Sequence, residues 1–185
     1  MKILPKITIV IVTLNNQRSI ARCLSAIAAQ DYPKKNIEYL NIDGGSTDGT
    51  KTILRTYGFR IIDSPIKRNA EAQRGIGVKL AKHNLIVSLD ADNYLPHKQW
   101  LRRMVQPFMD DPMVVHAGTL HYHFSKNDAL FNRYNALFGA IDPIVFYVGR
   151  PDRKPLYVRS DAPYTTSEYT PDTLPTVGCN GVVYR

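Results

Sequence analysis

Between residues 7 and 108, the hydrophobic positions of this chain follow two alternating periods. Continuous, mostly β-branched runs at 7–13, 37–43, 59–63 and 85–89 are typical of strands buried on both faces. The segments between them carry apolar residues every three or four positions, which is the period of an amphipathic helix. Strands that alternate with such helices predict an α/β fold with a mostly parallel, Rossmann-like sheet, right-handed crossovers and helices on both faces.

Capping residues and helix breakers predict where the helices begin and end. Four helices are expected, at 19–30, 46–57, 69–82 and 96–108. The hydroxyl of Ser19 is expected to cap the first helix, and that of Ser46 or Thr47 the second. Gly58 is expected to stop the second helix, and Pro96 to lie in the first turn of the fourth.

Further elements are predicted after residue 113, and the chain changes character from residue 143 onward. One or two further strands are expected at 114–124, and an amphipathic helix at 128–141. From residue 143 onward, prolines and tyrosines are frequent and hydrophobic periodicity is weak. This composition predicts long ordered loops over a substrate cleft, with a partly flexible connector as the alternative.

Two carboxylates, Asp90 and Asp92, end the apolar run at 85–89. Side chains two positions apart in an extended segment point to the same side, so both carboxylates can face one ligand. Ligands of open α/β sheets bind at the carboxyl ends of the strands, and hard oxygen ligands suit Mg²⁺ or Mn²⁺. The alternative is a solvated turn in which Asp92 or Asn93 caps the next helix.

The composition is that of a globular protein, and the charge favours some classes of binding partner over others. Of the 185 residues, 44% are hydrophobic and 22% charged, which is ordinary for a globular protein and argues against general disorder. The formal charge of +8 favours anionic partners: nucleotide phosphates, nucleic acid or an acidic membrane surface. Nucleic acid is not expected, because the basic residues are scattered and do not form a stripe with aromatics.

Cysteine usage and hydropathy indicate the compartment. Cys23 and Cys179 lie far apart and form no metal-type pair, which favours a reducing, cytoplasmic setting. No stretch reaches the roughly 18 apolar residues of a membrane span, and the N-terminal apolar run is too short for a secretory signal. The basic balance and residues 136–148 predict peripheral association with the inner face of an anionic membrane.

Four segments, taken together in this order, resemble the family 2 nucleotide-sugar glycosyltransferases of GT-A fold. They are 7–15, 42–50 (Ile-Asp-Gly-Gly-Ser-Thr-Asp-Gly-Thr), 74–77 and 89–92 (Leu-Asp-Ala-Asp). Residues 178–185 resemble the glycine-rich strand that lines the acceptor side in that family. The resemblance implies that residues 1–115 are the nucleotide-sugar-binding half of a single GT-A domain. It also implies that residues 116–185 are an incomplete start of the acceptor-binding half, so that the domain is C-terminally truncated.

The resemblance also implies a set of nucleotide-binding residues, namely Thr13, Leu14, Asn15, Asp43, Arg74, Asp90, Ala91 and Asp92. Asp43 is expected to accept a hydrogen bond from the base, and an Asx turn into the glycine loop is the alternative. Arg74 is expected to reach nucleotide oxygens, although an ordinary surface arginine also fits. Asp92, with Asp90, is expected to ligate the divalent cation, Mn²⁺ or Mg²⁺, that bridges the diphosphate.

Two positions depart from the family pattern. Gly44 stands where many relatives have a second acid, which predicts looser or different recognition of the base. Gly75 replaces the asparagine that follows the family's arginine. Gly77 is expected to allow close packing of the third helix on the sheet.

The activity implied is inverting transfer of a sugar from a nucleotide-diphosphate sugar, with a UDP-sugar favoured, to a hydroxyl of a glycan or lipid-linked acceptor. Transfer with inversion needs a general base, which the resemblance implies lies beyond Arg185. His116, His121 and His123 are candidates within the chain, but ordinary strand histidines are the favoured interpretation. The chain is therefore expected to bind its donor and to transfer poorly. A non-catalytic sugar-nucleotide-binding module is the alternative function.

Overall fold

A computed structural model describes residues 3–119, 126–127, 129–130, 133, 158–159, 164, 166–167 and 181–185. The chain divides into two compact units, one formed by residues 1–118 with 179–185 and the other by residues 119–178. In the second unit, β6 (Val158–Arg159) and β7 (Thr166–Ser167) pair in antiparallel fashion. The N–H of Arg133 donates to the carbonyl of Ala129 at 3.1 Å, the i to i−4 bond of a helical turn.

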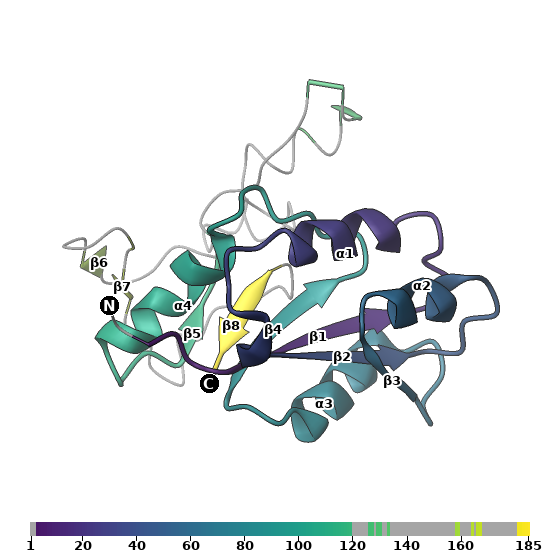
Figure 1. Ribbon diagram of the computed structural model, residues 1–185, viewed down its shortest axis with the longest axis horizontal. Helices are drawn as coiled ribbons and strands as arrows, with labels where there is room; N and C mark the ends of the chain where they lie inside the picture. The colour runs from purple at the N-terminus through teal and green to yellow at the C-terminus, as the bar shows by residue number, and fades with distance from the viewer. Residues whose placement is uncertain are drawn as a thin grey trace, which may run out of the picture. The chain divides into compact units, whose positions relative to one another are not determined.

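The first unit is built on a six-stranded sheet (Figure 1) in the order β3-β2-β1-β4-β8-β5. Its strands are β1 (Ile7–Thr13), β2 (Ile37–Asp43), β3 (Arg60–Asp63), β4 (Leu85–Asp90), β5 (His116–Ala117) and β8 (Val182–Tyr184). The first four are mutually parallel, and β8 runs antiparallel to both β4 and β5. The predicted strands and their parallel pairing are therefore confirmed, with β3 beginning one residue later than expected.

Helices cover both faces of this sheet, as predicted. They are α1 (Ile20–Ala28), α2 (Thr50–Thr56), α3 (Ala70–Leu80) and α4 (Trp100–Asp110), with a short 3₁₀ turn η1 (Lys34–Asn36) before β2. Figure 1 shows α1 and α2 on one side of the strands and α3 on the other. Alternate residues of β1 face the two layers: Ile9 packs in the cluster of α1, α2 and α4, and Val10 in the cluster of α3.

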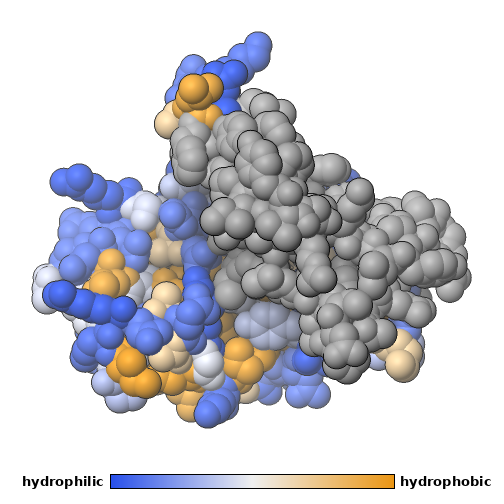
Figure 2. Space-filling view, turned by 180° about the vertical axis from the view of Figure 1, so that it is seen from behind, coloured by the Kyte–Doolittle hydropathy of each residue, from blue (hydrophilic) through white to orange (hydrophobic). Residues whose placement is uncertain are grey.

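Close packing of α3 on β1 depends on Gly77. A Cβ atom added at this position would lie 2.4 Å from Cγ1 of Val10, well inside contact distance. The expectation that Gly77 allows close helix packing is confirmed. On the outer surface of this unit, hydrophobic side chains are scattered among hydrophilic ones (Figure 2).

Two helices begin later than predicted. α4 begins at Trp100 instead of near Pro96. The carbonyl of Lys98 accepts from the N–H of Asp31 at 2.8 Å, and that of His97 accepts both from the N–H of Trp100 at 3.1 Å and from Nε2 of Gln30 at 3.0 Å. These bonds hold the chain before α4 against the segment that follows α1.

α2 begins at Thr50, and neither Ser46 nor Thr47 caps it. The hydroxyl of Ser46 instead accepts from the N–H of Asn15 at 2.9 Å, while Asp48 accepts from the N–H of Thr50 at 3.0 Å. Ser19 occupies the N-cap position of α1 as predicted, but its side chain makes no capping bond.

Several predictions fall wholly or partly outside the described residues. Of the strands expected at 114–124, the described part contains the two residues of β5. Most of the helix expected at 128–141, most of the proline-rich segment and residues 136–148 lie outside. Cys23 is free and buried, and Cys179 is not among the described residues. In the described part of the chain, no helix has the length and apolar character needed to cross a membrane.

Candidate active site

Strands β1, β2 and β4 end side by side and bring the predicted site residues to one edge of the sheet. Thr13 is paired with Asp43 across β1 and β2, and Val12 is paired with Asp90 across β1 and β4. The polar loops that follow these strands therefore meet at one edge of the sheet. We call this edge, with the loops that follow β1 to β4, the nucleotide edge, after the ligand that the sequence predicts for it.

Asp43 is wholly buried, and both of its carboxylate oxygens are occupied. Oδ1 accepts from the N–H groups of Gly45 at 2.9 Å and Ser46 at 2.7 Å, and Oδ2 accepts from the hydroxyl of Thr13 at 2.9 Å. Burial alone raises the pKa of Asp43, but hydrogen bonds from Ser46, Thr13 and Gly45 outweigh it and hold the pKa below its ordinary value. These bonds form the Asx turn that the sequence left as an alternative, and the base contact stays a prediction.

Lys51, which the sequence analysis missed, joins Asp43 to a neighbouring strand. Its Nζ lies 3.4 Å from Oδ1 of Asp43 and 2.5 Å from Oδ1 of Asp63 at the end of β3. The hydrogen bond to Asp63 raises the pKa of Lys51, and the charge of Asp43 adds to this effect. The late start of α2 puts Lys51 in its first turn, so a correct helix boundary was needed to find it.

The loop after β1 is tied to the loop after β2 by side-chain bonds. Asn15 has a left-handed φ of 54°, and its amide oxygen accepts from the N–H of Thr47 at 2.9 Å. Two residues later, Oε1 of Gln17 accepts from the N–H of Gly49 at 2.9 Å, and the N–H of Leu14 donates to Asn16 at 2.8 Å. Predicted residues 13–15 are therefore held in place before any ligand binds.

The departure from the family pattern at Gly44 has a packing explanation. A Cβ atom at this position would lie 2.5 Å from Nε2 of Gln73 and 3.2 Å from the carbonyl oxygen of Thr13. The Gln73 side chain is buried, and its Nε2 donates to the carbonyl of Ile66 at 3.5 Å. In this chain, Gln73 thus fills the space that a side chain at 44 needs. Gly75, by contrast, has open space around it.

Arg74 reaches from α3 to the end of β4. Its Nη2 lies 2.5 Å from Oδ1 of Asp90, and its Nη1 lies 2.5 Å from Oε1 of Glu71. Arg74 is mostly buried, so it is more than the ordinary surface arginine weighed from the sequence. The two ion pairs hold the Arg74 guanidinium beside the Asp90 carboxylate at the end of β4.

The segment after β4 forms a tight turn. The N–H of Asp90 donates to Oδ1 of Asn93 at 2.9 Å, and the N–H of Asn93 donates back to the carbonyl of Asp90 at 3.0 Å. Ala91 is buried and Asp92 is exposed. Sγ of Cys23 lies 3.7 Å from the Asp90 carbonyl oxygen. Burial raises the pKa of this thiol to about 12, with smaller contributions from the charges of Asp92 and Asp90.

The oxygen donors at this turn suit a hard divalent cation. Among the residues that the structure describes, no three His, Cys, Asp or Glu side chains are grouped closely enough to hold a metal alone. Asp90 and Asp92 supply carboxylate oxygens, which Mg²⁺ and Mn²⁺ prefer, and such ions commonly take their other ligands from substrate phosphates and water. The residues present therefore fit a cation that is held jointly with a diphosphate.

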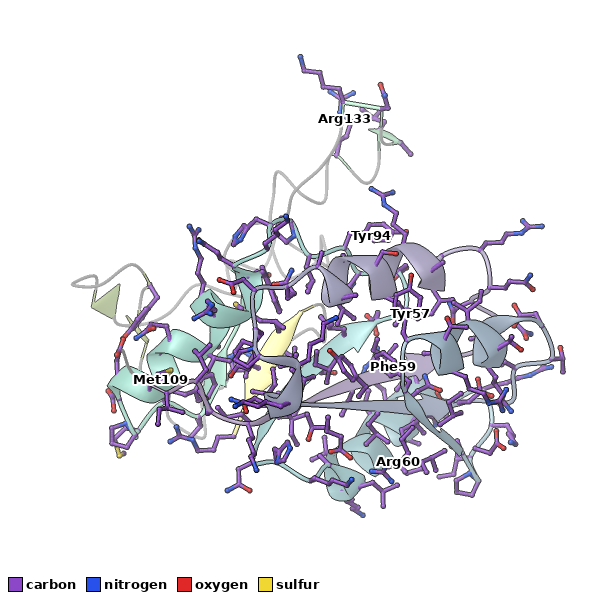
Figure 3. The ribbon with its side chains drawn as sticks, in the orientation of Figure 1. Tyr57, Phe59, Arg60, Tyr94, Met109 and Arg133 are labelled. Carbon is purple, nitrogen blue, oxygen red and sulfur yellow. The ribbon has the colours of Figure 1, made fainter. Side chains whose placement is uncertain are left out.

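Tyr94 follows the turn closely in the chain, whereas the candidate base His116 lies away from it. Tyr94 lies over α1 (Figure 3), where the guanidinium of Arg22 stacks on its ring at 3.9 Å. His116 is exposed on β5, level with Tyr184 and, across β8, with Ile86 near the start of β4. It is a strand histidine, as favoured. His121 and His123 are outside the described residues.

The sheet order, the antiparallel β8 and the acid-bearing end of β4 define a GT-A glycosyltransferase fold. Residues 8–166 match the family described as glycosyl transferase family 2, and the chain belongs to that family. The glycosyltransferase AglE of Haloferax volcanii is 29% identical over 138 residues, which cover 72% of this chain and 45% of that protein.

A second relative is dolichyl N-acetyl-alpha-D-glucosaminyl phosphate 3-beta-D-2,3-diacetamido-2,3-dideoxy-beta-D-glucuronosyltransferase of Methanococcus voltae. It is 29% identical over 131 residues, which cover 65% of this chain and 40% of that protein. This chain therefore spans less than half the length of either relative.

Solved structures show the same fold. The mannosyltransferase PcManGT of Pyrobaculum calidifontis, in complex with GDP-Man and Mn²⁺, is similar with a TM-score of 0.59 and 25% identity, over 64% of this chain and 36% of that one. Staphylococcus aureus TarS in complex with UDP has a TM-score of 0.55 and 22% identity, over 65% of this chain and 38% of that one. The TarS similarity concerns the fold alone.

Proposed function

We propose that this chain binds a nucleotide-diphosphate sugar at the nucleotide edge and serves in transfer of the sugar to an acceptor hydroxyl. The observation that carries the proposal is the convergence of Thr13, Asp43 and the Arg74–Asp90 pair at one sheet edge. Membership of glycosyl transferase family 2 supports the reaction class.

The spacing of the strands supports a nucleotide that lies across the sheet edge, from the end of β2 to the end of β4. Asp43 on β2 and Asp90 on β4 are separated by β1, and two strand spacings amount to about 10 Å. A nucleoside spans a similar length. We infer that the base lies toward Asp43 and residues 13–15, and that the diphosphate lies toward Arg74 and Asp90.

Asp92 and Asp90 are the residues that would hold Mn²⁺ or Mg²⁺ together with the diphosphate. A bound cation neutralises negative charge that develops on the departing nucleoside diphosphate. The exposed Asp92 carboxylate and the oxygen donors of the turn support this assignment, as does the Mn²⁺ in the structure of PcManGT. Arg74 holds the Asp90 carboxylate in position at the same place.

The proposed reaction inverts the configuration at the sugar C1. The acceptor hydroxyl attacks C1, the bond to the diphosphate oxygen breaks with its electron pair leaving on the nucleoside diphosphate, and a general base takes the hydroxyl proton. A glycan or a lipid-linked saccharide is the acceptor class that we propose, and a UDP-sugar is the favoured donor. A module that binds the donor without transfer is the competing function.

Calorimetry with UDP and GDP, each with and without Mn²⁺, tests the binding proposal. We expect one of the two to bind, and to bind more tightly with Mn²⁺. Failure of both nucleotides to bind would contradict the proposal. Release of the nucleoside diphosphate from a matching sugar donor on addition of acceptor separates an enzyme from a binding module, because a module binds the donor and releases nothing.

A further inference from the structure

The opposite edge of the same sheet gathers the segments that precede the strands. We call it the basic edge. Segment 3–6 leads into β1, η1 into β2, and the end of α3 into β4, while β8 ends there at Arg185. These segments carry exposed cations, namely Lys6, Lys34, Lys35, Lys79, Lys82 and Arg185. The topology therefore concentrates positive charge on one side of the first unit.

Acids at the basic edge offset only part of this charge. Glu38 lies 2.9 Å from the guanidinium of Arg60 and 4.0 Å from Nζ of Lys82. Asp31 lies 2.9 Å from the guanidinium of Arg102. Asp110 and Asp111 end α4 near the carbonyls that Arg185 binds. These acids are fewer than the exposed cations, so positive charge remains in surplus at this edge.

An open groove of about 430 Å³ lies within the basic edge, and Lys6, Lys82 and Arg185 line it together with His83. The chain around the groove is fixed by hydrogen bonds. The hydroxyl of Tyr32 donates to the carbonyl of Pro5 at 2.6 Å, and Nδ2 of Asn36 donates to that of Leu4 at 2.8 Å. The cations are therefore presented on an anchored surface.

Large aliphatic side chains are exposed on this same edge. Ile3 is 91% exposed, Met113 81% and Val115 66%. Val115 is next to the groove, because its carbonyl accepts from the N–H of Arg185 at 3.0 Å. Leu80, at the end of α3, is a further exposed aliphatic. The basic edge therefore combines exposed cations with exposed aliphatic side chains.

We propose that the basic edge is a docking surface for an anionic lipid membrane. Lysines attract anionic headgroups over the range of a Debye length, and aliphatic side chains beside them enter the headgroup boundary. Single-stranded nucleic acid is less well matched, because its bases stack on aromatic side chains and the exposed ones here are aliphatic. This surface lies at the strand starts, so the proposal does not depend on nucleotide binding.

Flotation of the full chain with phosphatidylcholine vesicles, with and without phosphatidylglycerol, tests the proposal. We expect the chain to float with the anionic vesicles only. The double variant Lys6→Glu/Lys82→Glu is expected to lose at least about tenfold in vesicle affinity. Lys67→Glu/Arg68→Glu is the matched control, because it makes the same charge change on exposed residues of the nucleotide edge, and it is expected to float nearly as well as wild type.

A second variant tests the apolar part of the surface. Ile3→Ser/Val115→Ser leaves the charge unchanged and is expected to weaken flotation, including at raised salt, where the contribution of the lysines is screened. The proposal is overturned if neither vesicle carries the chain, if neutral vesicles carry it equally, or if both charge variants lose affinity alike. It is also overturned if the basic-edge variant loses binding only to an oligonucleotide. Circular dichroism checks that each variant is folded.

Discussion

The two edges of the parallel sheet use charge in opposite ways. At the nucleotide edge, Asp43 is buried, and Lys51 and Arg74 are partly buried; each is held by a partner from another element, although other charged residues there, such as Lys67, are exposed. At the basic edge, lysines are exposed and lie among exposed aliphatics. Paired and buried charges have fixed positions, which suits recognition of one small ligand. Exposed charges act together over a longer range, which suits a surface without fixed geometry.

The largest expected effect follows from Asp92→Asn. If Asp92 ligates the cation as proposed, removing its charge should reduce the Mn²⁺-enhanced part of UDP affinity by about a hundredfold, because metal coordination contributes several kcal/mol. Calorimetric titrations with and without Mn²⁺ measure it. Asp111→Asn is the control, since it makes the same change at the basic edge. If the Mn²⁺ effect is the same in Asp92→Asn as in wild type, the metal assignment is wrong.

Asp43→Asn is expected to weaken nucleotide binding less than Asp92→Asn does, and to lower the stability of the fold more. The amide keeps an oxygen for the N–H groups of Gly45 and Ser46 but cannot accept from Thr13 on its nitrogen side. We expect about 1–3 kcal/mol lower free energy of unfolding, measured with urea, and about tenfold weaker UDP binding. Equal losses for UDP and CDP would indicate that Asp43 positions the loop, whereas a relative gain for CDP would indicate that it reads the base.

The stabilising effect of Asp43 is expected to depend on pH. Its pKa is lowered in the folded chain, so its contribution is fully present above the unfolded value of about 3.9 and is lost as pH falls through the folded value. The difference in unfolding free energy between wild type and Asp43→Asn should therefore shrink below about pH 4. A constant difference from pH 7 to pH 3 would contradict the charge-based explanation.

Lys51→Met is expected to have a smaller effect through Asp43. Loss of the cation removes a partner of Asp43 and Asp63, and we expect about 1–2 kcal/mol lower unfolding free energy with a severalfold loss in UDP affinity. Because Asp43 loses a nearby positive charge, its folded-state pKa should be lowered less, so its acid-induced loss of stability should be smaller and complete at a higher pH. Lys51→Arg should restore much of both properties. A Met variant with the wild-type acid profile would count against this role.

The smallest expected effect is that of Lys6→Glu/Lys82→Glu on nucleotide binding. The edges are separated by the length of a strand, more than two Debye lengths at physiological salt, so UDP affinity should stay within about twofold of wild type. The same calorimetry measures it. A large loss of UDP affinity in this variant would show that the two edges are not independent.

The strands were predictable because their signal is local. Continuous β-branched runs mark β1 and β4 as buried on both sides, and the paired register then brings Asp43 and Asp90 together. The role of Gly77 could also be predicted, because a glycine on the sheet-facing side of a helix indicates that helix and sheet pack closely.

The missed features depend on partners distant in sequence. The chain before α4 is held by bonds to Gln30 and Asp31, and Ser46 is withdrawn from capping by Asn15. The bridge from Lys51 to two strand ends likewise requires the folded sheet. Local propensity cannot show that a carbonyl or hydroxyl is already bound to another segment.

The length of β1 determines how far a membrane-anchored acceptor must extend from the bilayer to meet the nucleotide edge. Its seven residues, at about 3.3 Å each, separate the two edges by roughly 20 Å. A chain docked on lipid by its basic edge would hold the nucleotide edge at that height above the headgroups. An acceptor hydroxyl close to the bilayer would not reach it, whereas a saccharide extended by several units would. Transfer to membrane-anchored acceptors should therefore rise with the length of the saccharide that they already carry.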